Sequence, residues 1–347
     1  MTESTKVKRV KSSGYPVIFL AVILLLLFLG LLLCGRFEIT AADIGAMIRA
    51  FFSGRAVAPE LISKQLVFCW IRLPRCLMAI IVGMGLSVSG AVYQALFRNP
   101  LVSPDILGVA AGCTFGAALG LILPGHNFSL VPLFAFAFGL LAVAMTVGIA
   151  RLISVKPVIV LVLAGMVILS FFNALLMVLK YFSDPYDELP SIVFWIMGSL
   201  SRVTWHDLIL ITPVVGGGLI FFMLMRFRLN ILSLGDIPAK SLGLNPARFR
   251  LILIVLSSFI VALTVAGCGQ ICWIGLIVPH MARTLFGPDH KRMLPATALL
   301  GAIFLLAADG LARSVSGTEI PVGIITALTG APIFALLLYK NRGSGWV

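Results

Sequence analysis

The sequence predicts an all-α, polytopic integral membrane protein with about ten transmembrane helices, for three reasons. First, 60% of the 347 residues are apolar and only 11% are charged, whereas a soluble domain is nearer to 45–50% apolar and about 25% charged. Second, the charged residues lie between long apolar runs. Third, these runs are too long for barrel strands of roughly 9–11 residues, so they span as helices. The composition excludes a water-soluble globule, a disordered chain and a nucleic-acid-binding module.

Charge-free runs mark the individual spans, because a charge at the centre of a membrane helix costs roughly 2.5–3.5 kcal/mol. The runs that fit one helix are 15–35, 76–97, 157–179, 208–225, 293–308 and 320–339. Two others, 106–150 and 251–282, exceed one span of about 20 residues, and turn residues interrupt them at 124–127 and 267–270. We expect two helices from each, which gives ten in all.

Ten spans put both termini on one side of the bilayer, and the positive-inside rule selects the cytoplasm. That orientation places 17 of the 26 Lys and Arg residues on the inner side and 9 on the outer side. The basic start and first apolar run superficially resemble a signal peptide, but the run is long and no small-residue cleavage site follows Gly35. We expect a cytoplasmic tail over 1–14, a retained first helix and one transmembrane domain over 1–347.

The sequence lacks the residues that several common kinds of binding site and catalytic site require. No lysine follows a glycine, so the GxxxxGK[ST] phosphate loop is absent, and no HExxH motif occurs. The four histidines are scattered, no pair of carboxylates lies within a predicted span, and the six cysteines form no CxxC pair. We expect no catalytic residue, metal site or cofactor in this chain. Asp309, near the outer end of the ninth span, either makes a structural hydrogen bond or takes part in gating.

The connecting segment 226–250 predicts a short amphipathic helix at the inner face. Asp236 can cap free N–H groups and Pro238 suits a first helical turn, so the helix begins there. Gly243, followed by Asn245 and Pro246, ends it. Such a helix is either a surface for a partner protein or a helix that lies at the lipid headgroups.

Two further segments flank the second span. Pro74 fixes its start and leaves Arg72 and Arg75 at the outer mouth, against the positive-inside bias. These arginines either reach lipid phosphates or meet acidic residues of an extracytoplasmic partner. On the inner side, the loop 98–105 either forms a tight turn capped by Asn99 and Asp105 or closes the inner end of a pathway.

Several strings together resemble the FecCD family of ABC-importer permeases. They are RLPR (72–75), SGAVYQALFRNPLVSPDILGVAAG (89–112), LGDIPAKSLGL (234–244), GLIVPHMAR (275–283), LLAADGLAR (305–313) and EIPVG (319–323). The resemblance runs in order from the first span to Lys340. It implies a type II importer permease that pairs with a second copy or a related permease in a prokaryotic inner or plasma membrane. Two ATP-binding subunits, which hold ATP and Mg, attach on the inside, and a substrate-binding protein docks on the outside.

The resemblance also implies roles for individual residues. The cytoplasmic coupling segment that would sit in a cleft of each ATPase matches Ile231, Gly235, Asp236, Ala239, Leu242, Gly243 and Leu244. In the family, partly exposed arginines dock the binding protein, and the residues at the matching positions here are Arg72, Arg75 and Arg313. The candidates for an inner gate are Arg98, Asn99, Pro100 and Asp105.

The function implied is import of a metal chelate, with iron complexes (siderophore or haem) ahead of vitamin B12 and molybdate. A proton-coupled secondary transporter is the competing class, but it needs intramembrane acids or histidines for its coupling ion. A membrane enzyme needs clustered catalytic side chains, which the sequence lacks.

Overall fold

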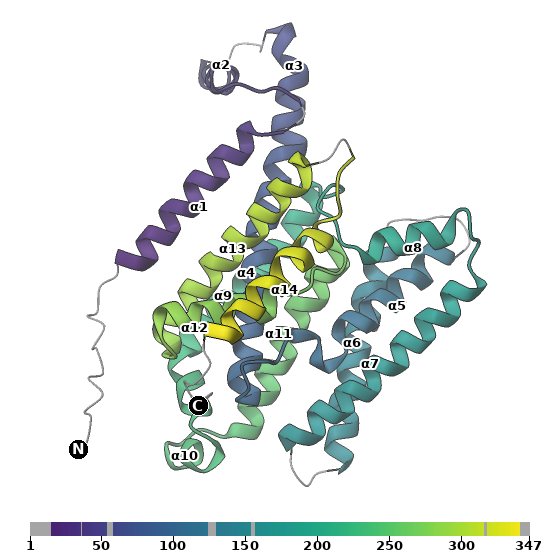
Figure 1. Ribbon diagram of the computed structural model, residues 1–347, viewed down its shortest axis with the longest axis vertical. Helices are drawn as coiled ribbons and strands as arrows, with labels where there is room; N and C mark the ends of the chain where they lie inside the picture. Colours follow the sequence, from purple (N-terminus) through teal and green to yellow (C-terminus); the bar gives the residue numbers. More distant parts are fainter. Residues whose placement is uncertain are drawn as a thin grey trace.

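The computed structural model describes residues 15–35, 37–53, 58–123, 130–153, 157–315 and 318–340, which form helices and turns and contain no strand (Figure 1). The predicted tail 1–14 and the turn 124–127 lie outside these residues. The helices are α1 (Tyr15–Leu33), α2 (Ala41–Ser53), α3 (Pro59–Leu66), α4 (Leu73–Phe97), α5 (Val109–Ile122), α6 (Leu130–Ile153), α7 (Pro157–Phe182), α8 (Glu188–Ile196), α9 (Trp205–Ser233), α10 (Asp236–Ser241), α11 (Pro246–Cys268), α12 (Ile274–Phe286), α13 (His290–Ser314) and α14 (Val322–Lys340).

The expected all-α membrane architecture is confirmed. Eight helical stretches of the described chain are long and apolar enough to cross a membrane, and α5 and α12 are shorter apolar helices. Together they account for the ten predicted spans. The predicted break at 267–270 is also present, because α11 ends at Cys268 and Gly269 adopts φ +70°. Irregular backbone at this depth lies against protein, where Ser199 N–H donates to the Cys268 carbonyl at 2.8 Å.

The bundle has two distinct ends (Figure 1). The short helix α10 lies at one end, together with the end of α14, and α2 and α3 project at the opposite end. We call these the α10 end and the α3 end. The spans alternate between them, so segments far apart in sequence meet at the α10 end. Arg98 lies against Gly235, and Asn230 Nδ2 donates to Asp289 Oδ1.

The prediction that Pro74 begins a helix is wrong. The helix is continuous from Pro59 to Phe97, because a π-helical stretch, η1 (Val67–Arg72), joins α3 to α4. Leu73 N–H bonds back to the Phe68 carbonyl across this wider turn. Proline removes a hydrogen-bond donor and its ring crowds the preceding turn, and a π turn leaves room for both.

Helices α2 and α8 were not predicted, and neither was α3, which extends α4. Helix α2 begins with a capping box in which Asp43 accepts from Thr40 N–H at 2.8 Å and Thr40 accepts from Asp43 N–H at 3.2 Å. Asp43 also pairs with Lys64 of α3 at 2.8 Å. Both α2 and α8 are too short, and too polar at their ends, to match the pattern of a membrane span. The Thr-x-x-Asp pattern of α2 is nevertheless present in the sequence.

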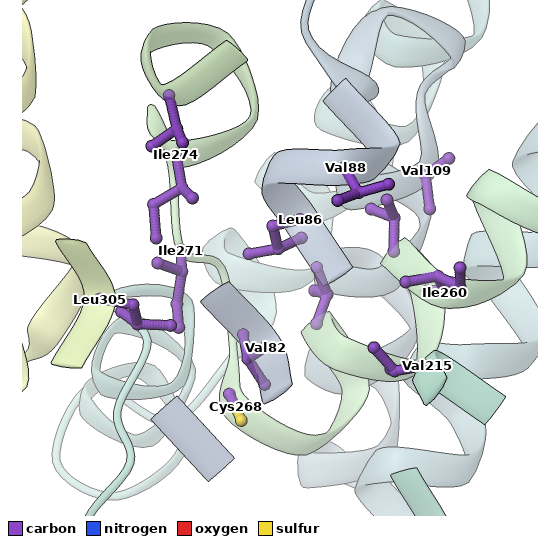
Figure 2. Packing of buried hydrophobic residues seen from close by; sticks show 14 of the residues in the cluster. Val82, Leu86, Val88, Val109, Val215, Ile260, Cys268, Ile271, Ile274 and Leu305 are labelled. Atoms are coloured by element: carbon purple, nitrogen blue, oxygen red, sulfur yellow. The ribbon is translucent and has the colours of Figure 1, made fainter. Parts of the chain in front are cut away.

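Helix α4 is the centre of the core. Its Val82, Leu86 and Val88 lie among apolar side chains of α9, α11, α12 and α13, including Val215, Ile260, Ile274 and Leu305 (Figure 2). Small residues allow this approach. A β-carbon added to Gly83 would overlap the Gly301 carbonyl of α13, and one added to Gly90 would overlap the Gly275 backbone of α12.

The contact at Gly90 yields a testable prediction. Gly90→Ala has to push α4 away from α12, and overpacking of a fitted core typically costs about 1–3 kcal/mol. We expect a lower melting temperature in detergent and less monodisperse protein. Gly216→Ala in α9 is the matched control, because nothing lies within 4 Å of its added β-carbon. Equal melting temperatures for the two variants would contradict the close approach of α4 and α12.

Candidate functional site

The predicted short helix is present as α10, held between α9 and α11 by two glycines. Gly235 precedes it with φ +116° and ψ 174°, a conformation essentially restricted to glycine, and Gly243 follows it with φ +77°. Asn245 caps the next helix, because its side chain accepts from Arg248 N–H at 3.1 Å. The local sequence thus fixes both ends of α10.

Asp236 does not cap α10 as expected; it forms an ion pair with Arg250 of α11. Arg250 Nη1 donates to Asp236 Oδ2 at 2.8 Å, and Nη2 donates to Oδ1. Arg250 is buried, while the Asp236 side chain is 39% exposed. A bidentate, charge-assisted pair is stronger than a neutral cap. Hydrogen bonds from Arg250 hold the pKa of the Asp236 carboxyl below its ordinary value.

The outer surface of this segment carries three large apolar side chains. Leu234, Ile237 and Leu242 are exposed, with Ile237 at 81%, whereas Ala239 is fully buried. Ile231 and Leu244 are half-buried. We call Leu234, Ile237 and Leu242 the coupling face. Three exposed apolar side chains on a rigid turn at the end of a bundle are typical of a surface that a partner covers.

The Asp236–Arg250 pair predicts how this segment responds to acid. Because its pKa is lowered in the folded chain, the ionised carboxylate stabilises the fold above the unfolded-chain pKa of about 3.9, and this contribution is lost as the pH falls through the lower folded value. After correction for intrinsic rates, we expect hydrogen-exchange protection of residues 235–250 to stay constant between about pH 8 and 5 and to fall below about pH 4. Asp236→Asn, the control, loses protection already at neutral pH. Full protection of the unmodified chain at pH 3 would contradict the role of the pair.

The loop predicted as a tight turn or an inner gate lies beside α10. Asn99 forms the turn, because its side chain accepts from Leu101 N–H at 2.9 Å. Pro100 follows, and Asp105 lies in the 3₁₀ turn η2 (Pro104–Leu107). Arg98 is exposed with φ +51°, and its Nη1 lies 3.1 Å from where a β-carbon of Gly235 would be. The structure therefore brings the loop and the helix together, which no spacing in the sequence indicated.

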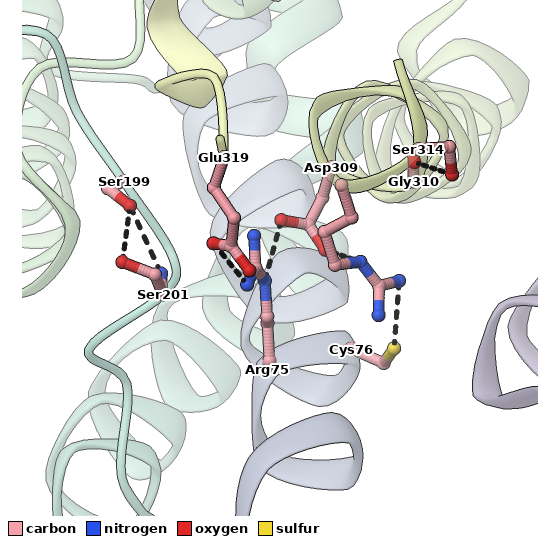
Figure 3. A network of polar contacts seen from close by, with 9 residues as sticks. Arg75, Cys76, Ser199, Ser201, Asp309, Gly310, Ser314 and Glu319 are labelled. Carbon is pink, nitrogen blue, oxygen red and sulfur yellow. Dashed lines mark hydrogen bonds and ion pairs between the residues drawn. The ribbon is translucent and has the colours of Figure 1, made fainter. Parts of the chain in front are cut away.

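At the α3 end, two of the three predicted docking arginines belong to a buried ion-pair cluster (Figure 3). Arg75 Nε donates to Asp309 Oδ1 at 2.9 Å, and Arg75 Nη1 donates to Glu319 Oε2 at 2.9 Å. Arg313 Nε lies 3.2 Å from Asp309 Oδ2, one helical turn away. The cluster joins α4, α13 and the segment that leads into α14.

The third arginine, Arg72, is bound to backbone. Its Nη1 donates to the carbonyls of Leu32 and Leu33 at 2.9 and 3.0 Å, and its Nη2 donates to the Phe37 carbonyl. It satisfies the last carbonyls of α1, which have no partner within that helix. We expected partly exposed arginines, but Arg72, Arg75 and Arg313 are only 3%, 3% and 7% exposed. That expectation of exposure is wrong, because internal acceptors hold all three guanidinium groups inward.

Asp309 makes the polar contacts that the first of its two predicted roles requires. It is fully buried and lies between two arginines. Glu319, whose side chain is 38% exposed, was not predicted as a functional residue. Across the described ranges, no three of His, Cys, Asp and Glu gather as metal ligands, and the six cysteines are unpaired.

Comparisons with known proteins agree with this architecture. The model of the FecCD transport family matches residues 21–340. The molybdate import permease MolB of Haemophilus influenzae is 40% identical over 339 residues, which cover 96% of this chain and 98% of MolB. The hemin permease HmuU of Yersinia pestis is 37% identical over 334 residues, covering 93% of this chain and 95% of HmuU. A solved structure described as an inward-facing metal-chelate-type ABC transporter has a TM-score of 0.83 at 38% identity, covering 94% of this chain and all of that one.

These matches extend over nearly the whole chain and confirm the family that the sequence strings indicated. Permeases of this type are transport components, which work with separate ATPase subunits and a binding protein and often dimerise. The chain described above, whose described residues hold eight helices long enough to span a membrane, the α10 segment and an apolar core around α4, belongs to the FecCD transport family and is an ABC-importer permease of the metal-chelate type.

Proposed function

We propose that this permease imports a metal chelate and that α10 transmits ATP-driven movement from the ATPase subunits to the membrane helices. The observation that carries the proposal is the coupling face, which presents three apolar side chains on α10 and on the residues that flank it, between α9 and α11. A helix of this kind fits a groove in a soluble partner. ATP and Mg bind to the partner subunits, and a second copy or a related permease completes the pathway.

The distribution of charge supports a cytoplasmic position for the α10 end. Among the described residues, eleven lysines and arginines lie in segments at that end and seven lie in segments at the α3 end. The positive-inside rule then puts α10, the loop around Arg98 and both chain termini in the cytoplasm. The α3 end would face the binding protein.

We further propose that the arginines at the α3 end support docking of the binding protein indirectly, by holding the surface that it contacts. Arg75 and Arg313 keep the outer rim rigid through Asp309, and Arg72 fixes the end of α1. Arg72 holds the last carbonyls of α1, so its loss would loosen the part of the docking surface that α1 forms. Arg72→Gln tests this: we expect weaker binding-protein capture at low salt, with ATPase assembly unchanged. Unchanged capture would remove Arg72 from the docking surface.

For the loop at the α10 end, we propose a role in closing the inner end of the pathway. The support is its position, because Arg98 lies against Gly235 and would move with α10. Asn99 and Pro100 fix the turn, and Asp105 lies within the next one, η2.

For the cargo, we propose an iron complex first, either a siderophore or haem, because the loop RNPLVSPDILG is most like that of iron-chelate permeases and HmuU carries hemin. Molybdate is the second candidate, since MolB matches the chain over almost its full length. Vitamin B12 is third, supported by a cobalamin permease at 39% identity over 276 residues.

One experiment separates these cargoes. Uptake of labelled iron chelate, haem, molybdate and cobalamin is measured in a strain that lacks this gene and in the same strain with the gene restored. Loss of one compound alone identifies the cargo. Loss of none would contradict all four assignments when the strain has no second importer for them.

A second experiment tests the class of transporter. Reconstituted with its ATPase, the permease is expected to transport only when ATP is supplied and to continue when an uncoupler collapses the proton gradient. Transport that needs the gradient and ignores ATP would instead identify a proton-coupled carrier.

A further inference from the structure

A cavity of about 930 Å³ opens at the α10 end, apart from the coupling face. It lies between the last turns of α6, the first turns of α7 and the start of α11, with the end of α4 behind it. None of Leu234, Ile237 and Leu242 lines it.

The lining of this cavity has two chemically different parts. The wall is apolar and consists of Leu96, Val147, Val158, Leu161, Leu251 and Ile254. The rim carries three exposed cations, Arg151, Lys240 and Arg248. Asp236 also lines the cavity, but it is paired with Arg250. Within the described ranges no carboxylate lies within ion-pair distance of the three rim cations, so the rim has an excess of positive charge.

The depth of the cavity matches the boundary of a bilayer. The rim lies where α6 ends, α7 begins and α11 begins, at the ends of three spans. From Pro246 to Ile254 the wall extends about 12 Å along α11, at 1.5 Å per residue. The polar region of one leaflet is roughly 5–8 Å thick. The cations therefore lie at headgroup depth and the apolar wall lies at acyl-chain depth.

We infer that this cavity binds an anionic phospholipid, with the headgroup phosphate at the rim of Arg151, Lys240 and Arg248 and an acyl chain along the apolar wall. Basic pockets between membrane helices on the cytoplasmic side are suited to anionic headgroups. A free anion would leave the apolar wall wet, and a neutral lipid would leave the cations unpaired. The site goes beyond the proposed transport function. Asp236, Gly243 and Leu244 of the coupling segment also line the cavity, but the three rim cations lie outside that set.

Lipid binding to the purified permease tests the inference. The chain is delipidated in detergent and titrated with phosphatidylglycerol or with phosphatidylcholine of the same acyl chains, and bound lipid is counted by native mass spectrometry. The test variant is Arg151→Gln with Arg248→Gln, which leaves α10 unchanged. The control is Arg228→Gln, an exposed arginine at the same end that does not line the cavity.

We expect one tightly retained phosphatidylglycerol on the unmodified chain and on the Arg228→Gln control. Each removed cation weakens binding of an anionic headgroup about fivefold, so the double variant is expected to bind it about thirtyfold more weakly. Equal melting temperatures of the double variant and the control show that both are folded.

Three results would overturn the inference. Equal retention of phosphatidylcholine would mean an apolar groove without headgroup selectivity. Displacement of the lipid by glycerol 3-phosphate at the same affinity would mean a site for a small phosphate compound. Loss of ATPase binding in the double variant with phosphatidylglycerol binding unchanged would assign the rim to the partner subunit.

Discussion

Replacing Asp309 with leucine is expected to destabilise the permease by about 3–5 kcal/mol, because it leaves two buried arginines without their shared carboxylate. Arg75 and Arg313 are 3% and 7% exposed and lie 2.9 and 3.2 Å from its two oxygens. Glu319 remains beside Arg75, but Arg313 has no other carboxylate among the described residues. The measurement is the melting temperature in detergent, together with the yield of folded protein from the membrane.

Two further variants sharpen this test. Glu319→Gln keeps an oxygen that can accept from Arg75 at a half-exposed position, so we expect a change of about 1 kcal/mol or less. Replacing all three buried members, as Arg75→Met, Asp309→Leu and Arg313→Met, removes every buried charge, and we expect it to recover much of the loss. A triple variant as unstable as Asp309→Leu alone would show that the site needs polar side chains for another reason.

Replacing Gly235 with valine is expected to lower uptake by about tenfold or more while the assembled importer still hydrolyses ATP. At φ +116° and ψ 174° a β-branched residue is strained by about 1–3 kcal/mol, and its side chain meets Arg98 Nη1. The strain displaces α10 from its position on α9 and α11. The measurement is transport and hydrolysis in the same proteoliposomes.

The control for this prediction is Gly243→Asn. Gly243 has φ +77°, which asparagine tolerates, and nothing lies within 4 Å of its added β-carbon. We expect uptake near that of the unmodified permease. If Gly235→Val and Gly243→Asn transported equally well, the position of α10 would not control coupling. If Gly235→Val lost hydrolysis as well, the segment would be needed for ATPase assembly instead.

The spans and α10 could be predicted from the sequence because their signals are local. A long charge-free run is enough to predict that its residues lie in the membrane. Asp236, Pro238 and Gly243 mark the two ends of α10 within one short segment. The capping box of α2 is an equally local signal, but α2 lacks the long apolar run that marks a membrane span.

The buried arginines could not be predicted in the same way. Arg75 and Asp309 are 234 residues apart, and no local pattern shows that α4 and α13 lie side by side. When that contact is not known, an arginine near the end of a span is predicted to be exposed. The same limit applies to Arg98 and Gly235, which meet only after the α4 and α9 ends come together.

The ion pair between Asp309 and Arg313 also bears on how α13 enters the membrane during biosynthesis. Its mean hydropathy, 1.8, is the lowest among the eight candidate spans, and an isolated charge adds roughly 2.5–3.5 kcal/mol to insertion at the centre of a span. Because the two residues are four apart on one helix, α13 leaves the translocon with its acid already neutralised by its own base. Arg75 is synthesised more than two hundred residues before α13. It can therefore pair with the Asp309 carboxylate only after α13 has entered the membrane. The packing of α13 against α4 is therefore stabilised by charge pairing as well as by apolar contacts.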